Sequence, residues 1–314
     1  MRNKKLISNF MLTITAIIWG TAFVAQSVAT DHIWAFAFNA ARNLIGGLVL
    51  IPYILITNRF KEKNSIEGTN ENKEKLTLSN WFKQNKILIV GGTLCGFFLF
   101  GGSTFQQLGI KYTSAGKSGF ITALYIILVP VVGIFFKKKV PFKVWICVLI
   151  AIIGFYLISI KENLTINIGD LLTLICAFFF TFHILVIDYF SPKVDGVKLS
   201  CIQFFVTSVI SLLFSLIFES TKLSDLIGAW FPILYVGIFS CGVAYTLQII
   251  AQKNTEPVIA SLIMSLESVF AALSGWLILN QTLSFKEAVG CLLVFIAIII
   301  TQLPSRNIEK VKME

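Results

Sequence analysis

Residues 131–160 read VVGIFFKKKVPFKVWICVLIAIIGFYLISI, in which a cluster of lysines separates two long apolar stretches. A helix needs about twenty mostly apolar residues to cross a bilayer. Stretches of this kind recur along the chain, and most of the gaps between them are short. The sequence therefore predicts an all-α integral membrane protein with ten transmembrane helices, at about residues 7–28, 33–56, 87–110, 117–136, 142–160, 169–189, 199–219, 227–251, 257–279 and 285–303.

The composition excludes a soluble protein. Of the 314 residues, 56% are hydrophobic and only 13% are charged, with a mean hydropathy of +0.82. Ordinary soluble domains carry about 25% charged residues. The net charge of +10 would suit a nucleic-acid partner, but the basic residues lie at the ends of the apolar stretches, where retention on the cytoplasmic side explains them. We therefore expect the lipid bilayer, and not nucleic acid, as the partner.

The distribution of lysine and arginine predicts an orientation, because cytoplasmic segments of membrane proteins are enriched in both. If the N-terminus is cytoplasmic, 20 of the 26 basic residues fall on the cytoplasmic side. Five fall outside, and one lies within the second span; these six are Lys111, Lys117, Lys161, Lys222 and Lys286, and Arg42. Both termini are therefore expected in the cytoplasm, which requires an even number of spans.

Ten spans divide into two halves of five. Because five is an odd number, a second copy of a five-span unit enters the membrane inverted relative to the first. The predicted units are residues 1–160 and residues 161–314, the latter ending in a short cytoplasmic tail. Within the first unit, the polar segment at about 57–86 is rich in Lys, Glu and Asn and is expected to be a mobile cytoplasmic loop.

Short motifs along nearly the whole chain resemble the ten-span EamA-type branch of the drug/metabolite transporter superfamily. They occur in the family's order and comprise Ile18–Phe23 (IWGTAF), Ala41–Asn43 (ARN), Thr113–Ala115 (TSA), Leu128–Pro130 (LVP), Gly169–Leu172 (GDLL), Ala244–Gln248 (AYTLQ), Ala251–Lys253 (AQK) and Ser265–Glu267 (SLE). Two positions depart from the family pattern. Asn280 and Gln281 replace a Gly-Glu pair after the ninth span, and Ser268 replaces a proline after the ninth-span glutamate.

The resemblance implies a central cavity lined by spans 1–4 and 6–9, with spans 5 and 10 outside it, and alternating access for small organic solutes. It leaves the solute open, because the superfamily includes exporters of amino acids and carriers of sugar phosphates, nucleotide sugars and vitamins. The lead hypothesis is secondary active or facilitative export of amino acids or related metabolites. The alternatives are uptake of a vitamin or nucleoside-like compound by the same fold, and a membrane enzyme or sensor that does not transport.

Ionisable residues inside apolar spans are costly and usually face a cavity or a partner. Arg42 lies about nine residues into span 2, or roughly 14 Å at the helix rise, and Glu267 about ten residues into span 9, or roughly 15 Å. Both are therefore expected near the midplane. They could pair with each other, bind an anionic group and an amine of a substrate, or be satisfied locally by neighbouring helices.

Three residues are candidates for coupling or gating. Glu267 could carry a proton, and so could His183, because histidine titrates near neutral pH; a neutral hydrogen-bonding role for His183 is the alternative. Pro130 lies within span 4 and frees a backbone carbonyl there, which allows either a hinge or a static kink. Coupling to a proton or another ion is thus one open possibility.

Many uncharged polar side chains also fall inside predicted spans, where Asn and Gln need hydrogen-bond partners. Their spread over six spans favours a wet central cavity over isolated pairs between helices. With the aromatic residues beside them, the candidates for substrate binding are Trp19, Phe23, Gln26, Phe38, Asn39, Arg42, Gln106, Tyr125, Gln203, Tyr245, Gln248 and Glu267.

Signals of catalysis are absent from the sequence, which contains no HExxH, GxSxG or P-loop pattern. The six cysteines all fall within apolar stretches, where they are expected to be small buried residues and not metal ligands. We therefore expect no enzymatic activity, no cofactor and no metal. The protein is expected to be a multi-pass component of a bacterial inner (plasma) membrane, with a small-molecule substrate.

Overall fold

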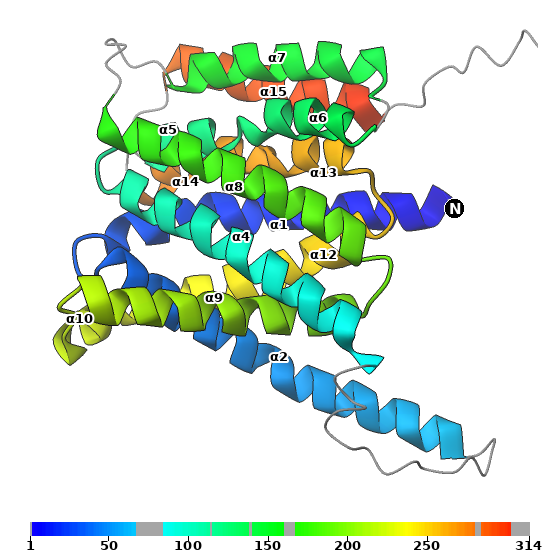
Figure 1. The fold of residues 1–314 in the computed structure, drawn as a ribbon. Coiled ribbons are helices and arrows are strands. Elements are labelled where there is room, and N and C mark those ends of the chain that lie inside the picture. The colour runs from blue at the N-terminus through cyan, green and yellow to red at the C-terminus, as the bar shows by residue number, and fades with distance from the viewer. Residues whose placement is uncertain are drawn as a thin grey trace, which may run out of the picture.

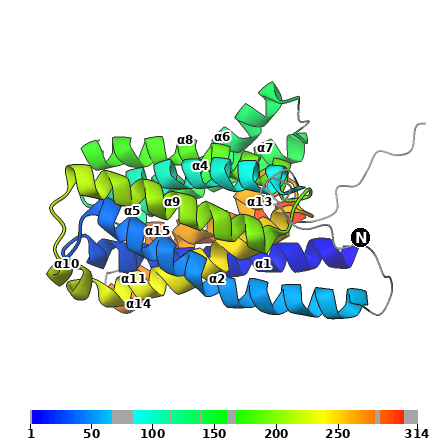
Figure 2. The ribbon, with the colours of Figure 1, turned by 60° about the horizontal axis from the view of Figure 1, so that its bottom comes forward.

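The computed structural model describes residues 2–66, 84–113, 115–137, 140–159, 167–279 and 284–302. All regular structure within these residues is helical. The long helices run side by side along one common direction (Figures 1 and 2). The prediction of an all-α fold is therefore confirmed for the described part of the chain.

The helices follow one another with short connections. They are α1 (Arg2–Ala29), α2 (Ala35–Ile66), α4 (Lys86–Ile110), α5 (Ala115–Thr122), α6 (Tyr125–Phe135), α7 (Phe142–Ser159), α8 (Ile168–Phe190), α9 (Gly196–Phe218), α10 (Leu223–Gly228), α11 (Trp230–Tyr235), the π-helix η1 (Val236–Tyr245), α12 (Thr246–Gln252), α13 (Pro257–Met264), α14 (Leu266–Leu279) and α15 (Phe285–Gln302).

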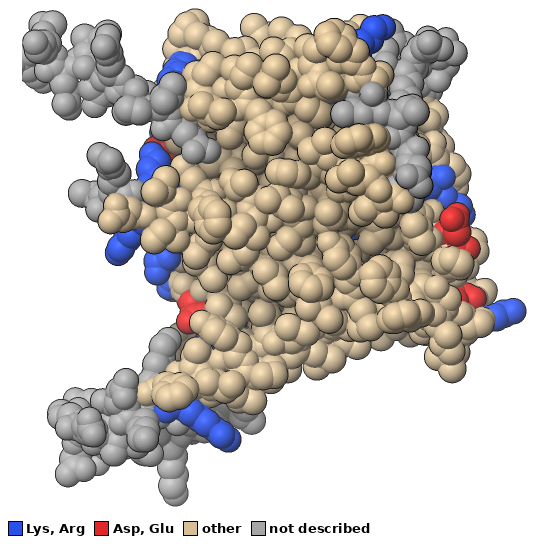
Figure 3. Space-filling view, turned by 180° about the vertical axis from the view of Figure 1, so that it is seen from behind, with Lys and Arg blue, Asp and Glu red and all other residues tan. Residues whose placement is uncertain are grey.

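Eight helical segments in the described residues are long and apolar enough to cross a membrane, and the apolar parts of α7 and α15 are shorter. These two helices pack against each other along one side of the bundle, at the top of Figure 1. On the face shown in Figure 3, charged side chains gather toward the two ends of the helices, with a broad uncharged belt between them. The molecule is therefore a multi-pass membrane protein, and the crossing of all ten segments stays a prediction.

The predicted loop at 57–86 is partly wrong, because α2 continues to Ile66. Residues 57–66 contain no proline or glycine, and Arg59, Lys61, Glu62 and Lys63 are good helix formers. The end of α2 therefore extends past the adjacent end of α9 (Figures 1 and 2). Residues 67–83, the rest of the predicted loop before α4, lie outside the described residues.

Three of the predicted spans contain interruptions. Span 4 breaks at Ala123–Leu124, between α5 and α6, so that Pro130 lies inside α6. Span 9 breaks at Ser265, and the Ser265 hydroxyl donates to the carbonyl of Leu262, a local bond that competes with the helical ladder. Span 8 contains the π-helix η1, a rare form that is frequent at functional sites. All three interruptions precede or contain residues of the central cavity described below.

Glycines bring helix backbones close together around this region. A Cβ on Gly20 of α1 would collide with the Cβ of Phe270 on α14 and lie 2.8 Å from the backbone nitrogen of Ala271. A Cβ on Gly109 of α4 would lie 2.9 Å from the carbonyl oxygen of Gly169 on α8. Because these neighbours are backbone atoms or their first side-chain carbon, they cannot turn away, so the glycines set the helix separations.

We predict that Gly20→Ala destabilises the fold by about 1–3 kcal/mol, the usual cost of overpacking, because the added methyl group forces α1 away from α14. Gly116→Ala is the matched control, since a Cβ there meets nothing within 4 Å. It should leave stability unchanged or raise it by up to about 1 kcal/mol through helix propensity. Thermal unfolding of both purified variants in detergent measures the difference. Equal melting temperatures would contradict the close α1–α14 packing.

Candidate functional site

A cavity lies within the bundle, lined by residues of α1, α2, α4, α5, α6, α8, η1, α12, α13 and α14. The empty space, with the open space that adjoins it, is about 450 Å³. Its walls are formed by Trp19, Phe23, Gln26, Arg42, Gln106, Thr122, Tyr125, Phe180, His183, Ile184, Ser240, Tyr245, Gln248, Met264 and Glu267. None of the described residues of α7, α9 or α15 belongs to this lining.

The cation of the cavity is Arg42 on α2, which is only 4% exposed. Its Nη1 donates a hydrogen bond of 3.0 Å to Oε1 of Gln26 on α1. Its guanidinium lies 5.2 Å from the ring centre of Phe38, one helical turn before it, a cation–π contact. The Nε of Arg42 is buried and has no hydrogen-bond partner in the structure. One donor of the guanidinium is thus left for a ligand or water.

The acid of the cavity is Glu267, in the first turn of α14, and it is 3% exposed. Its Oε1 accepts a hydrogen bond of 2.9 Å from the hydroxyl of Tyr125, which is the first residue of α6. A carboxylate near a helix N-terminus is favoured by the helix dipole. The breaks at Leu124 and Ser265 therefore place Tyr125 and Glu267 at two helix starts that face one another.

Arg42 and Glu267 line the same cavity, yet no ion pair joins them among the described residues; each has a neutral partner instead. Charges inside a membrane protein are expensive unless they pair, and they mark substrate or ion pathways. The predicted Arg42–Glu267 pair is therefore not formed in this structure. Two of the predicted alternatives remain: each residue is satisfied by its neighbouring helix, as the contacts with Gln26 and Tyr125 show, or each also faces a ligand.

Aromatic rings form the apolar part of the wall. The rings of Trp19 and Tyr245 lie 4.7 Å apart between centroids, and the ring of His183 meets Tyr245 edge to face at 5.8 Å. Phe23 and Phe180 complete the set. The indole Nε1 of Trp19 is buried without a partner in the structure, so this wall also offers a hydrogen-bond donor.

The polar part of the lining includes His183 on α8 and Gln248 on α12. The Nε2 of His183 lies 3.0 Å from Oε1 of Gln203 on α9, and its Nδ1 has no partner. The Nε2 of Gln248 donates to Gln252, and its Oε1 has no partner. Buried polar atoms in native structures are nearly always satisfied. Unpaired atoms gathered on one cavity therefore indicate a place for a polar solute or water.

Most of the predicted binding residues lie on this cavity. Trp19, Phe23, Gln26, Arg42, Gln106, Tyr125, Tyr245, Gln248 and Glu267 belong to the lining, as does His183. Phe38, Asn39 and Gln203 do not: Phe38 lies under Arg42, Asn39 donates to Thr104, and Gln203 contacts His183 from behind. Pro130 lies inside α6, away from the lining. The functional roles of all these residues stay predictions.

Five lining residues were not predicted, namely Thr122, Phe180, Ile184, Ser240 and Met264. Thr122, the last residue of α5 before the break in span 4, accepts a hydrogen bond of 3.4 Å from Gln106. Ser240 lies in η1. The other three are ordinary apolar residues in an apolar chain, so no sequence signal separates them from lipid-facing positions. The available clue is a shared helix face, as for Phe180, which lies three residues before His183 on α8.

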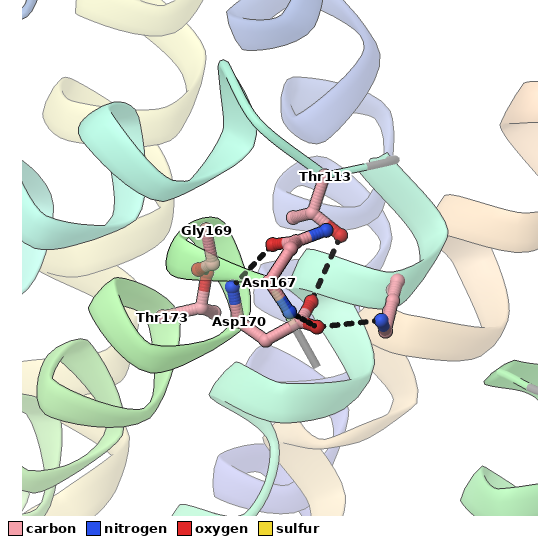
Figure 4. Close-up of polar contacts among 6 residues, drawn as sticks. Thr113, Asn167, Gly169, Asp170 and Thr173 are labelled. Carbon is pink, nitrogen blue, oxygen red and sulfur yellow. Dashed lines mark hydrogen bonds and ion pairs between the residues drawn. The ribbon is translucent and has the colours of Figure 1, made fainter. Parts of the chain in front are cut away.

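One end of the bundle is held by an ion pair between its two halves (Figure 4). Lys117 of α5 lies 2.6 Å from Oδ2 of Asp170 on α8, and Thr113 donates to Oδ1 of the same carboxylate at 3.1 Å. Asn167 and Asp170 also form a capping box that starts α8.

Comparison with known proteins agrees with the geometry. The model of the EamA-like transporter family matches residues 6–160 and 167–303. A protein of Archaeoglobus fulgidus named "Uncharacterized transporter" is 32% identical over 96% of this chain and 87% of its own length. The "Uncharacterized transporter YoaV" of Bacillus subtilis is 24% identical over 88% of this chain and 90% of its own length.

A solved crystal structure has the same fold, with a TM-score of 0.72 over 94% of this chain and 98% of that one, at 17% identity. Together with the family match over both halves of the chain, these relatives identify the multi-pass helical bundle around the cavity. The chain belongs to the EamA-like transporter family of the drug/metabolite transporter superfamily.

Proposed function

We propose that this protein carries a small zwitterionic organic solute, an amino acid or a related metabolite, out of the cell by alternating access. The central cavity is the binding site in this proposal. Arg42 takes the carboxylate of the solute, and Glu267 takes its ammonium group. The aromatic wall of Trp19, Phe23 and Tyr245 packs against the apolar part.

The observation that carries the proposal is that a buried arginine and a buried glutamate line one cavity without forming an ion pair with each other. Arg42 holds Gln26 and Glu267 holds Tyr125, and both partners are neutral. Burying two charges without pairing them lowers stability, and a solute with both charges would offset that cost at each end. A solute with one charge would leave the other uncompensated. Specificity for a zwitterion follows from this difference.

Two inverted five-span units support alternating access. In this arrangement, the helices of the first unit correspond in order to those of the second: α1, α2, α4, α5–α6 and α7 to α8, α9, α11–α12, α13–α14 and α15. Equivalent helices then make equivalent contacts. The packing of α4 on α8 corresponds to that of η1 on α1, and the packing of α4 on α9 corresponds to that of η1 on α2. The contacts of α2 with α9 and of α7 with α15 map onto themselves. The family match also divides the chain near residue 160. Such symmetry allows one unit to rock against the other.

The basic residues support an inner-membrane location with both termini in the cytoplasm. The end of the bundle that contains the α1–α2 turn and the start of α8 is then the outer end. In this orientation the Lys117–Asp170 pair lies at the outer end and joins α5 of the first unit to α8 of the second. Energy would come from an ion gradient, from exchange or from the gradient of the solute.

This orientation predicts the outcome of reporter fusions. Green fluorescent protein fused after residue 314 should fluoresce, and alkaline phosphatase fused there should be inactive, because the C-terminus is cytoplasmic. Alkaline phosphatase fused after Thr221, between α9 and α10, should be active. Activity measured in intact bacterial cells tests both positions. Active phosphatase at both residue 221 and residue 314 would contradict the three spans expected between them, and with them the ten-span arrangement. Active phosphatase at residue 314 alone would reverse the predicted orientation.

The binding site predicts a pattern of ligand selectivity. A thermal-shift screen of amino acids, vitamins, nucleosides and sugar phosphates should find the purified protein stabilised by amino acids, since binding stabilises the folded state. The best amino acid should bind more tightly than its decarboxylated amine or its deaminated acid, about ten- to a hundredfold for a charge-assisted contact. Titration calorimetry on the three compounds gives the ratios.

The charge-neutralising variants assign the two ends of the solute. Glu267→Gln should weaken the binding of the amino acid and of the amine but leave the binding of the acid unchanged. Arg42→Gln should weaken the binding of the amino acid and of the acid but leave the binding of the amine unchanged. Comparing the three ligands within each variant separates lost binding from lost folding, because a misfolded protein loses all three. Stabilisation by vitamins or nucleosides and not by amino acids would overturn the proposed solute class.

A further inference from the structure

A second pocket lies beneath the α1–α2 turn, at the end of the bundle where α4 ends. We call it the α1–α2 pocket. Its empty space, with the open space that adjoins it, is about 850 Å³, and its lining comes from α4, α10, the α1–α2 turn and the start of α2. None of its lining residues belongs to the lining of the central cavity.

Gln107 links this pocket to the interior. It follows Gln106 on α4, but the two side chains reach different cavities: Gln106 lines the central cavity and Gln107 lines the α1–α2 pocket. Gln107 is only 1% exposed, and its Nε2 donates 3.1 Å to the backbone oxygen of Gln26. Because a carbonyl oxygen can only accept, this bond fixes the orientation of the amide. Its Oε1 is buried without a partner.

The charges on the pocket favour a cation. Asp31 and Asp225 contribute two carboxylates, and Lys111 contributes one ammonium group. The Nζ of Lys111 lies 4.9 Å from the ring centre of Trp34, so its charge is partly engaged by that ring. His32 is the remaining titratable nitrogen base of the lining. Two carboxylates and an unpaired amide oxygen form an acceptor-rich surface.

A direct contact between Gln26 and Gln107 connects the linings of the two cavities. Gln26 belongs to the lining of the central cavity and accepts from Arg42 through its side chain, while its backbone oxygen accepts from Gln107. Gln26 therefore accepts one hydrogen bond from Arg42 in the central cavity and another from Gln107 at the α1–α2 pocket. Breaking the contact between Gln107 and Gln26 would remove one hydrogen bond between α4 and α1.

We propose that the α1–α2 pocket is a second binding site for the transported solute, which holds its ammonium group against Gln107 and the carboxylates of Asp31 and Asp225. The contact between Gln107 and Gln26 is the partition between this site and the central cavity. The solute occupies the two sites in sequence when the partition opens. This inference rests on the proposed function for the identity of the solute.

The charge preference of the pocket can be measured with thiol reagents. Leu108→Cys places a thiol in the lining, and the six native cysteines are all buried, which keeps the background low. A methanethiosulfonate that carries a trimethylammonium group should label Leu108→Cys severalfold faster than one that carries a sulfonate. Adding Asp31→Asn and Asp225→Asn should remove this preference. Phe285→Cys, on an 85% exposed residue at the same end, should show a ratio that these two substitutions do not change.

Protection from labelling tests for the ammonium group. The probes are leucine, its decarboxylated form 3-methylbutylamine and its deaminated form 4-methylpentanoate. Leucine and the amine should slow the labelling of Leu108→Cys, and the acid should not. Adding Gln107→Leu should abolish this protection. Adding Gln106→Leu, which alters the central cavity, should preserve it.

Equal labelling by the two reagents, or protection by the acid as strong as that by the amine, would overturn the second site. Leucine exchange across proteoliposomes, measured on the unsubstituted protein, reports transport separately. Transport of leucine without charge preference or protection at Leu108→Cys would refute the second site alone. Charge preference and protection by the amine, without transport of any amino acid, would refute the proposed function and leave a cation site at this pocket.

Discussion

An ionisable side chain buried in an apolar bundle is costly unless it has a partner. The interior of this protein is arranged around two such side chains that do not pair with each other. Arg42 and Glu267 are both at least 96% buried and line the same cavity. Each is held by a neutral neighbour, Gln26 for the guanidinium and Tyr125 for the carboxylate. Neither Gln26 nor Tyr125 carries an opposite charge that could compensate a guanidinium or a carboxylate. This arrangement is the basis of the proposal that the cavity binds a solute with one positive and one negative group.

The irregular backbone of the bundle serves this arrangement. Tyr125 and Glu267 lie just after the breaks at Leu124 and Ser265, and Tyr245 ends the π-helix η1. In lipid, non-helical backbone is tolerated only where it is buried in protein or lines a cavity. Ser268 ties the two broken spans together by donating 2.8 Å to the carbonyl of Gly119 on α5. The serine that replaces the family's proline thus keeps a structural role in span 9.

The sequence predicts the parts of this structure that depend on the cost of burial. Arg42 and Glu267 could be recognised as candidates because few ionisable residues occur in apolar spans. Glutamines such as Gln26 and Gln248 could be assigned to a cavity for the same reason. Helix ends were harder to place: α2 continues to Ile66 because its polar residues also favour helix, so polarity ended the predicted span too early.

The rest depends on contacts between residues that are far apart in the sequence, which local sequence patterns do not reveal. Phe38 and Gln203 are of the types that line the cavity, yet they lie behind Arg42 and His183. The bond from Thr15 on α1 to the carbonyl of Ala244 joins residues 229 positions apart. The π-helix and the break at Ser265 have no local signal as strong as a proline. Apolar lining residues such as Met264 cannot be told from packing residues in a chain with 56% hydrophobic residues.

An experimental structure of the protein with a bound amino acid, such as leucine, tests the central claim most directly. This account predicts density in the central cavity, with the carboxylate of the ligand at the guanidinium of Arg42 and its ammonium group at the carboxylate of Glu267. The same experiment without ligand should show Arg42 and Glu267 still apart. A direct ion pair between them in the ligand-free structure, or a ligand bound without contact to either residue, would contradict the account.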